Sequence, residues 1–247
     1  MFNIKQMCEN GGRIAACVNT RAKEVVRFDI KKIYKLASKV SEKVLVQVEG
    51  ATCSGKSSFV LDTYRVLKRK GIDAMTIEEA AAKVLIENNS LLIELTAHPT
   101  SSKQWEKSKM KLQKKVLSHQ LEALERFAEN DVSTVAIMDR GGASTAYHTI
   151  PVLSDNEKEL VEGICREIGR MSSHIILLSP IGFLDRSSPR YQKTLEEIEL
   201  EYRGIRSYLD KWKLDYSEIT SARRDTRVRT GIRYITALLD KMTPART

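Results

Sequence analysis

The sequence predicts an α/β fold in which helices cover both faces of a parallel sheet. From residue 41 onward, short apolar and β-branched segments alternate with longer segments whose apolar residues recur at helical spacing. The first such strand, residues 44–48, runs into the segment from Gly50 to Ser57, which fits the phosphate-binding pattern G-x-x-x-x-G-K-[ST]. An apolar-periodic helix follows over 58–68, so the motif has a strand before it and a helix after it.

Residues 1–40 precede the first strand and predict a small N-terminal extension. Residues 13–18 and 25–30 predict two strands joined as a hairpin, and residues 31–40 predict a short helix. A piece of this size cannot easily bury its own hydrophobic core. We therefore expect 1–40 to pack on a main domain formed by 41–247.

The remaining elements follow in the same alternation. Strands are predicted where apolar segments end in polar or turn residues, and helices where apolar residues recur every three or four positions. The predicted strands are 72–77, 132–138, 173–178 and 213–219. The predicted helices are 79–87, 105–127, 191–209 and 226–242, with a further short apolar segment at 91–95.

The phosphate loop carries the strongest functional prediction. Its glycines allow backbone N–H groups to wrap a phosphate, and the helix that follows presents its positive dipole end. Lys56 is placed to reach the β- and γ-phosphates, and the Ser57 hydroxyl to hold Mg²⁺. The predicted nucleotide-binding residues are Gly50, Ala51, Thr52, Cys53, Ser54, Gly55, Lys56, Ser57 and Ser58.

Asp139 ends the apolar strand predicted at 132–138. An acid at this position downstream of a phosphate loop is typical of the Walker B residue, which helps to hold Mg²⁺. The alternative is a turn residue, because Asp139 to Gly142 is also a good turn sequence. Arg140 either contacts an anionic group of an acceptor or pairs with a carboxylate.

Two further pairs of residues are candidates for phosphoryl transfer. Glu78 and Glu79 end the second strand, where a carboxylate can face an acceptor hydroxyl, and we favour Glu79. The alternative is that they stabilise the start of the next helix. Arg186 and Arg190 lie in a turn-rich segment and are candidates to close over the triphosphate; otherwise they pair with nearby glutamates.

The composition indicates which classes of ligand and partner the protein binds. The net charge of +9 favours anionic ligands, and lysines over 103–115 and arginines over 223–233 leave nucleic acid open as a partner, although a solvated helix face is the simpler explanation of the lysines. Four scattered cysteines predict neither a disulfide framework nor a zinc site, so a cytoplasmic location is expected. No segment approaches the roughly 20 apolar residues of a membrane-spanning helix.

Together these residues resemble the P-loop nucleoside and nucleotide kinase superfamily, and within it the nicotinamide-riboside-kinase-like and thymidylate-kinase-like group. The resemblance rests on the phosphate loop, on the acid-then-helix segment 76–83, and on the segment 135–147 with its Asp-Arg turn and Ala-Tyr. The chain departs from the group at Ala82 and Lys83, where an arginine is usual. The resemblance implies a three-layer P-loop NTPase fold with a five-stranded parallel sheet, and ATP and Mg²⁺ as cofactors.

Two functions are compatible with these patterns, and a third is disfavoured. The first is a kinase that transfers phosphate from ATP to a small acceptor, with Glu79 or Asp139 orienting the acceptor hydroxyl and Arg140, Arg186 and Arg190 holding charge. The second is an ATPase or polynucleotide kinase that acts on nucleic acid. A GTPase switch is disfavoured, because the chain has no [NT]-K-x-D motif for reading guanine.

Overall fold

The computed structural model describes residues 30–97, 102–181 and 193–242. Its centre is a sheet of five parallel strands in the order β2-β3-β1-β4-β5, which confirms the predicted fold class. The strands are β1 (Val44–Glu49), β2 (Ala74–Ile77), β3 (Val135–Asp139), β4 (His174–Leu178) and β5 (Tyr216–Ile219). The strand predicted at 13–18, residues 25–29 of the strand predicted at 25–30, and the predicted lid residues Arg186 and Arg190 lie outside the described residues. Ile30, predicted to end the second of these strands, is the first residue of a helix.

β1 occupies the middle of the sheet, paired with β3 on one side and β4 on the other. Val48 of β1 is aligned with Asp139 of β3, and Glu49 is aligned with Leu177 of β4. The chain leaves β1 toward β2 on one side and later crosses to β4 on the other, so the order of strands reverses at β1. Ligands of open α/β sheets bind outside the carboxyl ends of strands at such a reversal, and the phosphate loop begins there.

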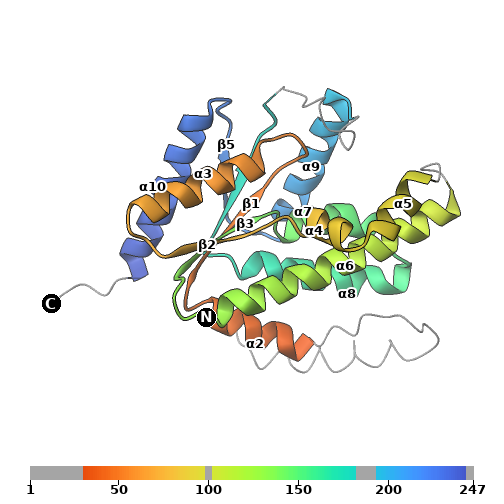
Figure 1. The fold of residues 1–247 in the computed structure, drawn as a ribbon, viewed down its shortest axis with the longest axis horizontal. Coiled ribbons are helices and arrows are strands. Elements are labelled where there is room, and N and C mark those ends of the chain that lie inside the picture. The colour runs from red at the N-terminus through yellow and green to blue at the C-terminus, as the bar shows by residue number, and fades with distance from the viewer. Residues whose placement is uncertain (1–29, 98–101, 182–192, 243–247) are drawn as a thin grey trace.

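Helices cover both faces of the sheet (Figure 1). α3 (Lys56–Arg69) and α10 (Arg224–Met242) lie on one face. The helices of the opposite face are α2 (Ile30–Val40), α6 (Lys103–Ala128), α7 (Gly142–Thr149), α8 (Asp155–Arg170) and α9 (Leu195–Lys211). Each face has its own hydrophobic cluster, as expected for three layers.

The side chains of β1 alternate between these two faces. Val44, Val46 and Val48 belong to the cluster under α3 and α10, whereas Leu45 belongs to the other. Gln47 and Glu49 share the phase of Leu45 and are fully buried. Two polar side chains therefore point into the layer that contains α7.

A third, smaller cluster joins α6 to two short helices at one end of the molecule, α4 (Ala80–Glu87) and α5 (Asn89–Ala97). Figure 1 shows these helices beyond the edge of the sheet, beside the long α6. α4 follows β2 directly, so Glu79 lies at the junction between the sheet and this helical region.

α2 confirms the helix predicted at 31–40. Ile33, Leu36 and Val40 are buried in the cluster that also contains α6 and α8. The wider division of the chain at residue 40 stays a prediction. 

Other boundaries differ from the prediction for local reasons. β5 begins at Tyr216 rather than 213, because Lys213 has a φ of 54° and its N–H closes the end of α9 on Asp210. β2 begins at Ala74, because the N–H of Ile72 is still bonded to Leu67 of α3. No element was predicted between 140 and 172, where the structure has α7, α8 and the short 3-10 helix Ile150–Val152.

Candidate functional site

The phosphate loop forms the turn between β1 and α3. Gly50 has a φ of 143°, and a Cβ atom there would lie 2.6 Å from the backbone oxygen of Leu178, so only glycine fits. Cys53 and Gly55 also have positive φ, at 60° and 80°, and α3 begins immediately afterwards at Lys56. This tightly wound backbone ends at a helix N-terminus, which is the geometry that binds phosphate.

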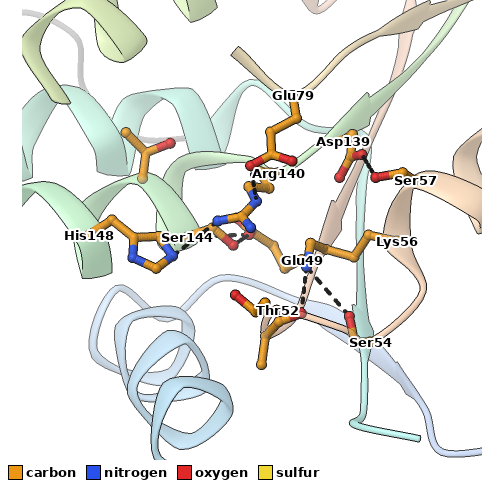
Figure 2. Close-up of polar contacts among 12 residues, drawn as sticks. Glu49, Thr52, Ser54, Lys56, Ser57, Glu79, Asp139, Arg140, Ser144 and His148 are labelled. Atoms are coloured by element: carbon orange, nitrogen blue, oxygen red, sulfur yellow. Dashed lines mark hydrogen bonds and ion pairs between the residues drawn. The ribbon is translucent and has the colours of Figure 1, made fainter. Parts of the chain in front are cut away.

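Lys56 is 6 % exposed and its ammonium group lies within the loop (Figure 2). Nζ donates to the backbone oxygen of Ala51 at 2.6 Å and to Ser54 Oγ at 3.5 Å. Burial lowers the pKa of Lys56 to about 8, and the positive charge of Arg140 contributes in the same direction. The lysine is therefore held where phosphate oxygens would stabilise its charged form.

Ser57 and Asp139 meet beside the loop. Ser57 Oγ donates to Asp139 Oδ2 at 2.5 Å, which joins the start of α3 to the end of β3. Asp139 is 4 % exposed and, within the part of the chain that the structure describes, its Oδ1 has no hydrogen-bond partner. Burial raises the pKa of Asp139, although Lys56 and Ser57 oppose this shift.

These two residues fit a Mg²⁺ site. A hydroxyl and a carboxylate with an unsatisfied buried oxygen are hard oxygen donors, and Mg²⁺ in nucleotide sites uses one or two protein ligands plus phosphates and water. The described residues contain no group of three or more His, Cys, Asp or Glu side chains that would form an all-protein metal cage. The sequence predicted the same two residues as Mg²⁺ ligands, and that role stays a prediction.

Glu79 and Arg140 form an ion pair at the ends of β2 and β3. Arg140 Nε lies 3.1 Å from Glu79 Oε1, and both side chains are largely buried. Arg140 has a φ of 67°, an uncommon conformation for a non-glycine residue that costs about 1 kcal/mol or more. The next residue, Gly141, passes so close to Gln47 that a Cβ atom there would clash with that side chain.

A polar pocket opens next to the phosphate loop and is the candidate acceptor site. Its empty volume, including space open to solvent, is about 520 Å³. It is bounded by the phosphate loop, the end of β2, and helices α4, α6 and α7, so a molecule in it would lie beside the bound phosphates. The lining residues are Thr52, Glu79, Ala80, Ala81, Gln113, Val116, Gln120, Arg140, Ser144, Thr145 and His148.

A buried charged network closes one wall of this pocket. Arg140 Nη1 lies 3.0 Å from His148 Nε2, and His148 Nε2 also lies 3.1 Å from Glu201 Oε1 of α9. Glu201 also accepts from Thr52 Oγ1 at 3.2 Å and from Lys193 Nζ at 2.6 Å. The network therefore connects the phosphate loop to α7 and α9.

Gln47 and Glu49 of β1 hold the start of α7. Glu49 Oε1 accepts from the backbone N–H of Ala143 at 2.9 Å, and its Oε2 accepts from the N–H of Ser144 at 3.1 Å and also from Ser144 Oγ. Gln47 Oε1 accepts from the N–H of Gly142 at 3.2 Å. A carboxylate satisfies the free N–H groups of a helix N-terminus, and here it fixes the helix that carries Ser144, Thr145 and His148.

Arg227 of α10 holds the opposite side of the phosphate loop. Its guanidinium, in a residue that is 4 % exposed, donates to the backbone oxygens of Ser54, Ser179 and Ser221. These oxygens belong to the phosphate loop and to the segments that follow β4 and β5. One side chain thus ties together three loops at the carboxyl edge of the sheet.

Most of the basic residues that left nucleic acid open have protein partners. In the arginine cluster, Arg224 pairs with Asp62, both Arg223 and Arg229 pair with Asp225, and Arg227 is internal. In the lysine run on α6, Lys114 pairs with Glu157 and Lys115 donates to Asn88. These contacts neutralise positive charge that could otherwise bind the phosphates of a nucleic acid.

The structure thus brings Lys56, Ser57, Glu79, Asp139 and Arg140 into one region (Figure 2). The sequence analysis missed four contributors: Glu49, His148, Glu201 and Arg227. A signal existed for Glu49, because a charged residue two positions after Gln47 in an apolar strand marks a buried polar face. The other three lie on helices, where sequence alone gives no sign of their partners.

The comparisons with known proteins agree with this geometry. The model of the AAA_28 family, described as an AAA domain, matches residues 45–227, from β1 to Arg227. The chain belongs to this family. No curated protein matches the chain.

Two solved structures share the fold. One is NadR protein in complex with NAD and AMP-PNP, with a TM-score of 0.57, 16 % identity, and coverage of 81 % of this chain and 50 % of that one. The other is NadR protein in complex with NR, with a TM-score of 0.56, 13 % identity, and coverage of 96 % and 59 %. The chain therefore spans half of one NadR chain and 59 % of the other.

These matches confirm, as a likeness of fold, the resemblance to the P-loop kinase group with nicotinamide-riboside-kinase-like members. The chain is a P-loop NTPase of this AAA-domain family. In the described part of the chain, no helix has the length and apolarity needed to cross a membrane.

Proposed function

We propose that the protein transfers the γ-phosphoryl group of ATP, with Mg²⁺, to a hydroxyl or phosphate of a nucleoside, a nucleotide or a related small acceptor. The observation that carries this proposal is the pocket beside the phosphate loop, lined by Thr52, Glu79, Arg140 and His148. An enzyme that only hydrolyses ATP needs a water molecule there, whereas the polar side chains that line this pocket come from the phosphate loop, the segments after β2 and β3, α6 and α7.

The residues divide the work between the two substrates. Lys56 would bind the β- and γ-phosphates, and Ser57 and Asp139 would hold Mg²⁺, which neutralises phosphate charge when bound. The sequence left Glu79 and Asp139 as alternatives for orienting the acceptor. The geometry favours Glu79, because it lines the pocket, whereas Asp139 is bonded to Ser57.

Arg140 would act between the two substrates. Its guanidinium is within reach of Glu79 and His148 in the pocket, and its charge lowers the pKa of Lys56 across the phosphate loop. A cation in this position stabilises negative charge that develops as the phosphoryl group moves. Arg186 and Arg190 remain proposed contributors from the segment outside the described residues.

The solved neighbours support a small acceptor. Their NadR chains hold NAD and AMP-PNP in one structure and NR in the other, all of them small molecules. The alternative, an ATPase or polynucleotide kinase that acts on nucleic acid, rests on the net charge of +9. The ion pairs of Lys114 on α6 and Arg224 on α10 take up part of this charge.

The test is a Mg·ATP turnover assay with panels of nucleosides, nucleotides, vitamin ribosides and short RNA or DNA, with ADP and phosphorylated acceptor measured together. One new phosphate ester per ADP, formed from a small acceptor, is the expected result. ADP without a phosphorylated product would indicate an ATPase. Turnover only with nucleic acid, with an affinity that falls steeply with salt, would support the alternative.

A further inference from the structure

We infer that Glu201 is a positioning residue for the acceptor pocket: it fixes His148 as a hydrogen-bond donor and so directs Arg140 to Glu79 at the edge of that pocket. This inference rests on the proposed function for its kinetic consequence, but its structural core does not. It concerns a side chain of α9 that the phosphate-loop and Walker B motifs do not include.

Glu201 is placed by three contacts from three parts of the chain. Its side chain is fully buried. Oε1 accepts from Thr52 of the phosphate loop and faces His148 of α7, and Oε2 accepts from Lys193 just before α9. Burial alone would raise the pKa of Glu201, but His148 and then Lys193, whose Nζ lies 2.6 Å from Oε2, lower it strongly, so the carboxylate stays ionised.

His148 Nε2 has two competing neighbours. Glu201 Oε1 lies 3.1 Å from this nitrogen and can only accept, whereas Arg140 Nη1 lies 3.0 Å away and can only donate. One ring nitrogen cannot do both. If Nε2 carries the proton, the imidazole is bonded to Glu201; if it does not, the imidazole captures Arg140.

The ionised carboxylate decides between these states. An Nε2 lone pair would face the negative charge of Glu201, so the proton belongs on Nε2. The imidazole then does not accept from Arg140, and the guanidinium is directed to Glu79, 3.1 Å away at the edge of the pocket. His148 contributes a fixed wall rather than a second partner for Arg140.

The charges around His148 give the pH dependence. Glu201, Arg140 and Lys193 are the charged groups that face it, and the ring of Tyr147 lies edge-on with a centroid distance of 5.1 Å. Burial lowers the pKa of His148, Arg140 and Lys193 lower it further, and Glu201 opposes them. Protonation of His148 would therefore place a second cation beside Arg140, in surroundings that disfavour it.

The test starts with the wild-type protein and needs no acceptor. ¹⁵N NMR of labelled histidines distinguishes a protonated Nε2 from an unprotonated one, and the sequence has only four histidines. His148→Gln identifies the signal, and His174→Gln, at the start of β4, is the matched control. A protonated Nε2 is expected in the wild type and a mixed or reversed tautomer in Glu201→Gln; an unprotonated Nε2 in the wild type would overturn the inference.

The kinetic consequence is measured once an acceptor is known. Glu201→Gln keeps the shape and the Thr52 contact, so ATP affinity should change less than about twofold, whereas the KM for the acceptor should rise roughly tenfold. The acid limb of kcat/KM for the acceptor should move to lower pH, because the imidazolium loses its carboxylate. Glu199→Gln, on the exposed side of the same helix, should change neither.

His148→Gln separates positioning from a simple loss of packing. The acid limb should disappear in this variant, and the double variant with Glu201→Gln should be no worse than His148→Gln alone. Additive losses, or an acid limb that Glu201→Gln does not move, would overturn the inference. If the wild type transfers phosphate to no acceptor, the proposed function fails, and the NMR result still decides how Glu201 controls His148.

Discussion

The two halves of the site are built in different ways. The nucleotide half is a single segment of backbone, residues 50–57, wound by positive φ angles at Gly50, Cys53 and Gly55. The acceptor half is assembled from side chains of the phosphate loop, β2, β3, α4, α6 and α7, supported by Glu49 and Glu201 from behind. The first half would bind phosphate through backbone N–H groups, and the second would bind an acceptor through particular side chains.

The two halves therefore differ in the substitutions that they tolerate. Backbone N–H groups survive most substitutions in the loop, so nucleotide binding depends on its glycines, on Lys56 and on the Arg227 clamp. The acceptor wall depends on side-chain contacts, between Glu79 and Arg140 and between His148 and Glu201. Variants in the second half should change the choice and use of the acceptor while they spare ATP.

The largest effect is expected from Lys56→Ala, which should abolish turnover. Among the described residues, Lys56 is the only lysine whose ammonium group lies inside the phosphate loop. Its loss should lower turnover by at least about 100-fold, measured as ADP formation under saturating ATP. Lys70→Ala, at the exposed end of the same helix, is the control and should keep full activity. Retained turnover in Lys56→Ala would remove the loop from the mechanism.

Glu79→Gln tests the separation of the halves directly. The amide keeps the size of the side chain but loses the charge that faces Arg140 and the acceptor. We expect transfer to slow by about 100-fold, with ATP affinity unchanged in a calorimetric titration. Glu78→Gln is the matched control, because Glu78 is exposed and does not line the pocket. An unchanged transfer rate in Glu79→Gln would exclude this residue as the group that orients the acceptor.

The same difference explains how far the sequence could predict the site. Lys56 and Ser57 belong to one contiguous motif, and Asp139 ends a strand with an obvious apolar pattern, so local sequence placed all three. Glu49, His148 and Glu201 act through contacts 53 to 149 positions away in the chain. Such pairs depend on how α7 and α9 pack, and α7 itself was not predicted, since the turn-like Gly-Gly hid the start of a short helix.

The fold was more predictable than the site for the same physical reason. Each strand shows its apolar period in four to six residues, and the parallel order follows from the intervening helices. α8 was missed although Val161, Ile164, Cys165 and Ile168 recur at helical spacing. The helical spacing of α8 could be recognised in the sequence, whereas the hydrogen bond from Gln47 to the end of α8 could not.

Arg227→Met should damage the nucleotide half through its support. Three backbone oxygens would lose a buried donor, which we expect to cost about 3 kcal/mol of unfolding free energy. For a chain of this size that corresponds to a fall in Tm of about 6–12 °C, with weaker ATP binding at temperatures where the protein stays folded. Arg229→Met, two residues along the same helix and exposed, should change Tm little. A Tm equal to that of the wild type would mean that the three loops hold together without the clamp.

The smallest effect is a proton linked to nucleotide binding. The pKa of Lys56 is about 8 in the free protein, and phosphate oxygens would raise it by favouring the ammonium form. Binding should therefore take up protons, and affinity should fall about fourfold between roughly pH 7 and pH 8.5. Calorimetry in buffers of different ionisation enthalpy measures this uptake. Lys56→Arg should remove it, because a guanidinium stays charged in this range; wild-type binding without proton uptake would show that the buried lysine is already fully charged, and that the phosphate loop is better solvated than its side-chain contacts indicate.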